Sequence, residues 1–364
     1  MKAGIVGLPN VGKSTLFNCL SNARAQSANF PFCTIEPNIG VVNVPDPRLA
    51  KLESLVHPER VVPATVEIVD IAGLVKGASK GEGLGNQFLG NIRETDAIIH
   101  VLRCFDDENV VHVDGHVDPI RDKETIDIEL QLKDLETVEK KYDKVLRASR
   151  TGDKEAQKEE AVLRKVKEQL ESGTSVRAID IADEDRTDYI TALQLLTDKP
   201  VLYLCNVDEA SAAEGNEYVE KVKEAVQHEN AEVLFLAVGV EADIAELEDY
   251  EERQLFLEDI GLDEPGSAKL IRKAYKLLNQ QTYFTAGIKE VRAWTVTVGA
   301  TAPQAAGVIH TDFEKGFIRA EVIKYEDYVI YKSEAKVREA GKIGIEGKDY
   351  IVQDGDIMHF RFNV

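Results

Sequence analysis

Long apolar runs and a basic leader segment are both missing from this 364-residue sequence. No stretch approaches the roughly 18 consecutive apolar residues that a membrane-spanning helix needs. The chain passes from Met1 directly into an apolar, strand-like segment, without a cleavage site. We therefore expect a cytoplasmic protein with no membrane partner.

Paired cysteines are missing as well. The four cysteines, Cys19, Cys33, Cys104 and Cys205, have no regular spacing, and each lies inside or beside an apolar segment. A disulfide framework is signalled by an even set of cysteines at regular spacings in a secreted chain. We therefore expect all four to be reduced and to act as small apolar residues.

Basic charge is scarce, because 44 Lys and Arg face 65 Asp and Glu, for a net charge of -21. Such a surface favours solubility and argues against nonspecific binding of polyanions by the whole molecule. Residues 279–364 are close to neutral, with 11 basic and 12 acidic residues, so the acidity belongs to the first three quarters of the chain. Any contact with nucleic acid must therefore be local.

The pattern that is present is an alternation of short apolar segments with helical stretches. Strands are predicted at Lys2–Val6, Val41–Val44, Thr65–Val69, Ala97–Leu102, Val201–Cys205 and Val233–Ala237. This order is typical of an α/β core with a mostly parallel sheet. About a hundred residues separate the fourth strand from the fifth, far more than a crossover needs, so we expect an insertion there.

The insertion has the pattern of an antiparallel helical hairpin, a coiled coil with one apolar face. Apolar residues recur at helical spacing before and after a break at 149–153, at Ile128, Leu132, Leu135, Val138, Tyr142, Val145, Leu163, Val166 and Leu170. Its polar face is either a solvated surface or an arm that docks on a partner. Aromatic and β-branched residues dominate from about Thr282, as in 293–298 and 328–331, which predicts a β-rich module. The predicted domains are 1–121 with 200–278, 122–199, and 279–364.

A complete P-loop motif occupies Gly7–Ser14, directly after the first predicted strand and before a helix that begins near Lys13. Its glycines allow the backbone to curl so that successive amides, with the helix N-terminus, hold phosphate oxygens. The predicted nucleotide-binding residues here are Asn10, Val11, Gly12, Lys13, Ser14 and Thr15. Lys13 is expected to reach the β- and γ-phosphates as a catalytic residue, and Ser14 Oγ to ligate Mg²⁺.

Two further segments follow in the order that a G-type site requires. Thr34 precedes the second strand, and Asp70 and Gly73 follow the third. Thr34 is expected to close onto Mg²⁺, and Asp70 to hold the metal through water. The amide of Gly73 is expected to donate to the γ-phosphate, which makes it a catalytic candidate.

These segments also carry a family resemblance. The stretches Asn29-Phe-Pro-Phe-Cys-Thr-Ile-Glu-Pro-Asn38 and Asp70-Ile-Ala-Gly-Leu-Val-Lys-Gly-Ala-Ser-Lys-Gly-Glu-Gly-Leu-Gly-Asn86, with the layout of the whole chain, resemble the YchF or Obg-like ATPase family. The resemblance implies an Obg-type G domain, a coiled-coil insertion and a C-terminal TGS domain, which is a ubiquitin-like β-grasp module. It also implies association with ribosomes.

The base-recognition motif is Asn206-Val-Asp-Glu209, in place of the Asn-Lys-x-Asp of guanine-specific relatives. Val207 lacks the alkyl stem of the lysine that covers the base, and Glu209 has a longer arm than the aspartate that accepts two hydrogen bonds from guanine. Asn206, Val207 and Glu209 are therefore predicted to bind the nucleotide with weakened guanine discrimination. Backbone groups near Val207 are suited to adenine, and the resemblance points to ATP in the same way. Retained or dual use of GTP is the alternative.

The group that activates water is left open. Leu74 stands where many GTPases have a glutamine, so intrinsic hydrolysis should be slow. His112 is one candidate for a catalytic residue, and a surface or packing histidine is the alternative. Asn10 is the other candidate, as a residue that helps to hold K⁺ in place of a finger arginine. Positioning alone is the third possibility.

The leading hypothesis is a monomeric, Mg²⁺-dependent ATPase switch in translation, whose ribosomal partner is the large subunit and its RNA. Arg292, Trp294, His310, Phe313 and Arg319 form either a mixed aromatic and basic face for RNA or ordinary core packing. A GTPase with a degenerate base motif and a nucleotide-binding scaffold without turnover are the competing functions.

Overall fold

The computed structural model describes residues 1–22, 39–71, 84–107, 110, 115–229, 231–247 and 249–363. The chain forms two compact units, Met1–Gly40 with Glu67–Leu270, and Val41–Val66 with Ile271–Val364. Residues 41–66 therefore group with the C-terminal part of the chain, although the sequence pattern placed them in the nucleotide-binding domain. The described residues form two six-stranded sheets, one built mainly from each unit.

The sheet built mainly from the first unit has the strand order β2-β4-β1-β5-β6-β7. Its strands are β1 (Lys2–Val6), β2 (Ile39–Asn43), β4 (Thr65–Asp70), β5 (Ala97–Arg103), β6 (Val201–Asn206) and β7 (Ala231–Leu236). The pairs formed by β4, β1, β5, β6 and β7 are all parallel. Every residue of β5 and β6 is buried, as expected for central strands covered on both faces. The predicted α/β core with a mostly parallel sheet is confirmed.

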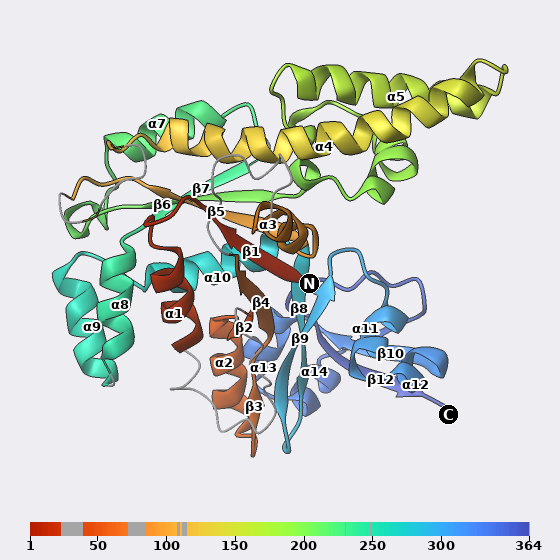
Figure 1. The fold of residues 1–364 in the computed structure, drawn as a ribbon. Helices are drawn as coiled ribbons and strands as arrows, with labels where there is room; N and C mark the ends of the chain where they lie inside the picture. The colour runs from red at the N-terminus through yellow and green to blue at the C-terminus, as the bar shows by residue number, and fades with distance from the viewer. Residues whose placement is uncertain are drawn as a thin grey trace. The chain divides into compact units, whose positions relative to one another are not determined.

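Helices connect these strands and cover the sheet (Figure 1). They are α1 (Lys13–Asn22), α3 (Leu84–Arg93), α4 (Pro119–Ser149), α5 (Lys154–Glu171), α6 (Asp183–Asp185), α7 (Glu217–Val226), α8 (Val238–Glu246), α9 (Tyr250–Asp259) and α10 (Gly266–Leu277). Among the described helices, none combines the length and the apolar character required to traverse a bilayer. Short 3₁₀ or π turns occupy Val176–Ala178, Arg186–Ile190, Thr191–Leu193, Leu196–Asp198 and Glu209–Ser211.

The position of β1 explains where the site lies. β1 pairs with β4 on one side and with β5 on the other, so the order in which strands are added to the sheet reverses at β1. Such a reversal opens a crevice at the carboxyl ends of the strands, where α/β proteins bind ligands. The P-loop follows the carboxyl end of β1, and α1 begins at Lys13, as the sequence predicted.

The insertion is the predicted antiparallel hairpin of α4 and α5, which extends away from the sheet of its own unit (Figure 1). Asp118 caps α4, and Asp153 caps α5. The hairpin core contains Val138, Val145, Leu163, Val166 and Leu170, all from the predicted apolar face.

The predicted apolar face is wrong for the first half of α4. Ile128 is 53% exposed and Leu132 is 48% exposed, whereas Ile126 and Leu130 are buried. The reason is a change of packing partner along the helix. α5 covers the second half of α4, while the first half packs against the sheet and the turn at Leu196–Asp198, so another face points inward.

Buried ion pairs hold the first half of α4 in place. Lys123 Nζ lies 2.6 Å from Asp127 Oδ2 and 2.7 Å from Glu229 Oε1. Glu229 also receives hydrogen bonds from Arg177 at 3.1 Å and from the Tyr203 hydroxyl of β6 at 2.8 Å. Because removing one member of a buried charged pair is costly, this network fixes the base of the hairpin to the sheet.

The second unit contains a mixed sheet with the order β11-β10-β12-β8-β9-β3. Its elements are α2 (Pro47–Val56), β3 (Val61–Val62), β8 (Gln280–Ala286), β9 (Val291–Thr297), α11 (Ala302–Ile309), α12 (Thr311–Lys315), β10 (Phe317–Ile323), α13 (Tyr325–Tyr331), α14 (Glu334–Glu339), β11 (Gly344–Glu346) and β12 (Ile357–Phe362). β8 pairs antiparallel with β9 and parallel with β12, and the core gathers between the sheet and α11. A sheet with a covering helix agrees with the expected β-grasp module.

Two details of this unit differ from the sequence pattern. The aromatic and β-branched segment 328–331 lies in helix α13 rather than in a strand, with Tyr328 as its buried residue. The pairing of Val61 and Val62 with Val291 and Arg292 brings a segment from far upstream into the sheet. Both outcomes depend on tertiary contacts, which override local β propensity.

Candidate functional site

The P-loop has the curled backbone that the motif predicts. Asn10 and Gly12 have positive φ values of 62° and 100°. A Cβ atom on Gly7 would lie 2.6 Å from the carbonyl oxygen of Val101 in β5, and one on Gly12 would lie 2.6 Å from Asn206 Nδ2. Glycine is therefore required at both positions by close approach, and at Gly12 also by the left-handed conformation.

Lys13 folds back over the loop that precedes it. Its Nζ donates a hydrogen bond of 2.6 Å to the carbonyl oxygen of Leu8, and the residue is only 7% exposed. Burial lowers the pKa of Lys13 from 10.5 to about 8, against the attraction of Asp70. An anionic phosphate beside the ammonium would favour the charged form and raise this pKa again. The lysine thus lies over the loop as a phosphate-binding residue requires.

Ser14, in the first turn of α1, lies beside Asp70, the last residue of β4. Ser14 Oγ donates to Asp70 Oδ2 at 3.3 Å. The other carboxylate oxygen, Oδ1, is buried, and within the described part of the chain it has no hydrogen-bond partner. A hydroxyl and a carboxylate with an unsatisfied oxygen are hard oxygen ligands, which suit a small divalent cation. The residues present therefore fit the metal ion that the P-loop class implies.

Asn206 joins the P-loop to the rest of the sheet. Its Nδ2 donates to the carbonyl oxygen of Val11 at 3.0 Å, and its Oδ1 accepts from the amide of Val238 at 3.0 Å. The sequence predicted that Asn206 binds the nucleotide. The structure shows that both ends of its side-chain amide hold backbone groups, so its geometry is that of a positioning residue for the loop.

The other two residues of the base motif have contrasting surroundings. Val207 is 2% exposed, and its amide donates to the carbonyl oxygen of Leu236 at 3.0 Å. Its own carbonyl oxygen receives no hydrogen bond from the described residues. Glu209 is exposed and begins a 3₁₀ turn that Asp208 caps by accepting from the Ser211 amide. The Val207 carbonyl is thus a backbone acceptor of this motif that has no partner among the described residues and can accept a hydrogen bond from a base.

Three predicted site residues, Thr34, Gly73 and His112, lie outside the described residues. Of the remaining P-loop residues, Val11 is buried, and Thr15 is exposed on the first turn of α1. Sequence reasoning missed the Val238 amide, which holds Asn206 in place from the start of α8. No local signal points to it, because the two residues are brought together only by the pairing of β6 with β7.

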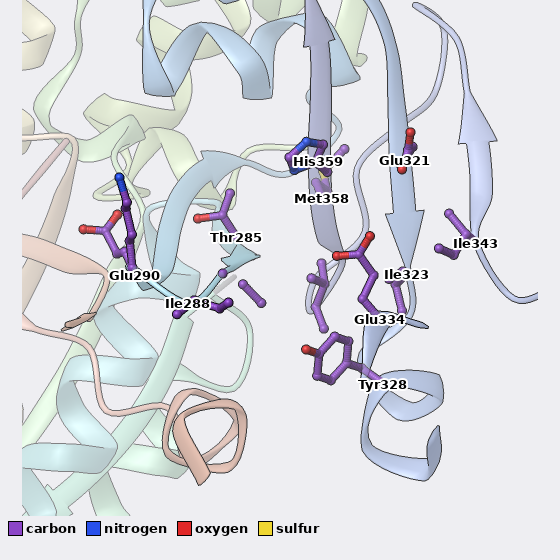
Figure 2. Close-up of a pocket in the computed structure, with 14 residues that line it drawn as sticks. Thr285, Ile288, Glu290, Glu321, Ile323, Tyr328, Glu334, Ile343, Met358 and His359 are labelled. Atoms are coloured by element: carbon purple, nitrogen blue, oxygen red, sulfur yellow. The ribbon is translucent and has the colours of Figure 1, made fainter. Parts of the chain in front are cut away.

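A separate cavity of about 480 Å³ lies in the second unit (Figure 2). Its wall includes Thr285, Glu321, Tyr328, Glu334 and His359, and no residue predicted to bind nucleotide. Glu321 is paired with Arg338 and Arg361, and Glu334 with Arg338. These carboxylates are therefore already neutralised by the protein.

Three cysteines, Cys19, Cys104 and Cys205, are free and buried, which confirms the prediction of small apolar roles for them. Burial raises the pKa of the Cys19 thiol to about 11. A thiol with so high a pKa has little thiolate at neutral pH, so it is a poor nucleophile. Cys33 falls outside the described residues.

A phosphate-binding loop between a parallel strand and a helix, with its lysine and a Ser14–Asp70 pair, defines a P-loop nucleotide-binding protein of the α/β class. Comparison with known proteins narrows this class. The chain is 59% identical over 363 residues to "Ribosome-binding ATPase YchF" of Escherichia coli, a match that covers 100% of this chain and 99% of the relative. The chain belongs to the YchF family.

Other comparisons agree with this assignment. The Bacillus subtilis protein of the same name is 54% identical over 366 residues, with 100% of both chains covered. A solved structure, "Structure of the Schizosaccharomyces pombe YchF GTPase", has a TM-score of 0.89 and 40% identity, and the match covers 99% of this chain and 97% of that one. Residues 2–147 match a family model described as a 50S ribosome-binding GTPase, and residues 280–363 match YchF-GTPase_C, described as a protein of unknown function. The P-loop family implies a divalent metal.

Proposed function

We propose that this chain is a Mg²⁺-dependent ATPase that binds ATP at the P-loop, hydrolyses it slowly and associates with ribosomes in the cytoplasm. The observation that carries the proposal is the arrangement of Lys13 over the loop with Ser14 beside Asp70. Relatives are named as ribosome-binding ATPases, which supports the same activity and partner for this chain. The proposal includes that the protein acts as a monomer.

The proposal for the base rests on the Val207 backbone. A carbonyl oxygen accepts a hydrogen bond from the N6 amino group of adenine, whereas the O6 atom of guanine is itself an acceptor and would be repelled. The buried valine side chain covers no base in the way that a lysine stem does. The exposed side chain of Glu209 has no hydrogen bond or ion pair with the described residues that would hold it in the orientation that guanine requires. ATP is therefore the preferred nucleotide.

The chemistry follows from the residues around the phosphates. Water attacks the γ-phosphorus, the bond between the γ-phosphorus and the bridging oxygen breaks, and ADP and phosphate leave. Lys13 neutralises the charge on the β- and γ-phosphate oxygens, and Asn206 keeps the loop amides in place. Mg²⁺, when bound by Ser14 and Asp70, would supply positive charge for the same oxygens.

Roles for residues outside the described part of the chain belong to the same proposal. Thr34 would add a ligand to Mg²⁺, the Gly73 amide would donate to the γ-phosphate, and His112 would orient water. Asn10, which is among the described residues and has a φ of 62° on the loop, would help to bind K⁺ in the same proposal. Phosphate release measured in K⁺ and in Na⁺, with His112→Ala alongside, tests both suggestions.

A comparison of the affinities for ATP and GTP tests which nucleotide the protein prefers. The names of the relatives point both ways, because the B. subtilis protein is called an ATPase and the S. pombe protein a GTPase. Calorimetry with ATP and GTP in Mg²⁺ should show tighter binding of ATP, and a clear preference for GTP would refute the base argument. Binding without phosphate release, with and without ribosomes, would instead favour a scaffold.

A further inference from the structure

The end of the α4–α5 hairpin has a charge opposite to that of the whole chain. The hairpin tip, defined as residues 144–158, has five basic residues and two acidic ones, in a chain with 44 basic and 65 acidic residues. The five are Lys144, Arg147, Arg150, Lys154 and Lys158, and all are exposed. They lie around the loop that joins the two helices, at the end of the hairpin that is distant from the sheet of its own unit (Figure 1).

The basic residues of the hairpin shaft are paired, whereas those of the tip are not. Shaft residues have carboxylate partners, for example Lys140 with Glu136, Lys141 with Glu159 at 2.7 Å, and Lys167 with Glu139 at 3.0 Å. Among the ion pairs and side-chain hydrogen bonds of the described residues, none involves the five basic side chains of the tip. Their positive charge is therefore available to a partner.

The two acidic residues of the tip already have structural roles. Asp153 caps α5, since its Oδ1 accepts hydrogen bonds from the amides of Glu155 at 3.0 Å and Ala156 at 3.2 Å. Glu155 accepts a hydrogen bond of 2.5 Å from the Tyr189 hydroxyl. Both carboxylates are held by neutral donors, so neither is directed at a basic side chain of the tip.

The basic side chains of the tip are spaced along the two helices in a way that suits binding to several neighbouring anionic groups. Lys144 and Arg147 lie on the last two turns of α4, and Arg150 is its C-cap residue in a helical conformation. The three are spaced three residues apart, and with a rise of 1.5 Å per residue they span about 9 Å. Lys154 and Lys158 are four residues apart at the start of α5, so they share one face. The two helices together present a compact group of positive charges.

The hairpin is held firmly enough to present this tip as an arm. Besides the Lys123 network, the buried carboxylate of Asp134 accepts hydrogen bonds from the amides of Leu196 at 2.8 Å and Thr197 at 2.7 Å. These contacts tie α4 to the chain segment that returns to β6. A charged group on a fixed arm loses little conformational entropy when it meets a partner.

We propose that the hairpin tip docks on the phosphate backbone of ribosomal RNA. None of the large hydrophobic side chains that are exposed in the described residues lies within 144–158. A protein interface usually has an apolar or aromatic centre, whereas binding to a nucleic-acid backbone is dominated by basic charge. This inference rests on the ribosome association proposed above, and it assigns the RNA contact to a surface outside the nucleotide site.

The test compares two pairs of lysine substitutions on the same hairpin. Lys154→Gln/Lys158→Gln removes two unpaired charges from the tip, and the control Lys140→Gln/Lys167→Gln removes two paired charges from the shaft. Binding to purified bacterial 70S ribosomes is measured by sedimentation over a series of KCl concentrations. The tip variant should bind at least about 10-fold more weakly at 0.1 M salt, with a salt slope reduced by about 1.5, while the control stays within about 2-fold of wild type. Arg147→Gln/Arg150→Gln should repeat the result of the tip variant.

Two further measurements separate the possible outcomes. ATP turnover without ribosomes should be equal in all variants, which shows that the fold and the nucleotide site are intact. Equal ribosome binding by tip and control variants would overturn the docking inference and leave the proposed function standing. If the wild type does not bind ribosomes, the proposed ribosome association is wrong, and binding of the same variants to protein-free large-subunit RNA tests the tip. A salt slope equal in the tip variant and the wild type would overturn the docking inference. A smaller salt slope in the tip variant would support it. A tip variant that loses ribosomes but keeps wild-type affinity for protein-free RNA would assign the contact to an acidic ribosomal protein and overturn the RNA assignment.

Discussion

Substitution of Asn206 by alanine tests how the P-loop is held in its phosphate-binding shape. The wild-type side chain donates to the Val11 carbonyl and accepts from the Val238 amide, both at 3.0 Å, and it is buried. Asn206→Ala leaves both backbone groups without these partners. An unsatisfied buried group costs about 1 to 3 kcal/mol, so the pair should lower the free energy of unfolding by about 2 to 6 kcal/mol.

The same change should weaken ATP binding, because the loop amides must then be ordered by the nucleotide. If about half of that free energy serves to hold the loop, ATP affinity should fall about 5- to 140-fold, since about 1.4 kcal/mol corresponds to a factor of ten. Isothermal titration calorimetry with Mg²⁺ and ATP measures the affinity, and urea unfolding measures the stability.

Asn216 offers a matched control in the same unit. It also makes two hydrogen bonds to backbone, from Nδ2 to the Cys104 carbonyl at 2.8 Å and to Oδ1 from the Val219 amide at 3.2 Å, but it does not touch the P-loop. Asn216→Ala should therefore destabilise the fold and leave ATP affinity unchanged. Equal ATP affinity in Asn206→Ala and wild type would refute the positioning role.

Three other changes test the site and the core. Lys13→Ala should largely abolish triphosphate binding because the cation over the loop is lost, and unchanged affinity by calorimetry would contradict its assignment. Asp70→Asn should raise the Mg²⁺ concentration needed for half-maximal ATP binding by about 10-fold, since one charged ligand is removed; an unaltered Mg²⁺ titration would mean that Asp70 does not serve the metal. Burial lowers the pKa of His100 to about 4. Between pH 6.5 and 4 this histidine is therefore protonated in the unfolded chain but not in the folded chain, so the free energy of unfolding falls as the pH falls through this window. From pH 6.5 to pH 5 the loss of stability is about 1.5 kcal/mol. His100→Gln should abolish this pH-dependent loss, as measured by urea unfolding at each pH. An identical pH dependence in the variant and the wild type would exclude His100 as the source of the effect.

The nucleotide site was predictable wherever its parts are consecutive in the chain. β1, the glycines of the P-loop and the start of α1 at Lys13 form one local unit, whose backbone conformation depends on residues within a few positions. The central strands β5 and β6 were also predictable, because a strand buried on both faces must be apolar throughout. Local periodicity and glycine placement carry this information without reference to distant residues.

Tertiary structure decided the features that depend on which surfaces meet. Ile128 and Leu132 fit an apolar stripe, yet they are exposed because the first half of α4 faces the sheet instead of α5. Asn206 is part of a base-recognition motif in the sequence, but its amide holds Val11 and Val238, which are 195 and 32 residues away. The sequence by itself thus determined the P-loop and the positions of the parallel strands along the chain. Long-range packing determined the inward faces and the partners of the buried polar groups, because each buried donor or acceptor must be satisfied by whatever the folded chain brings beside it.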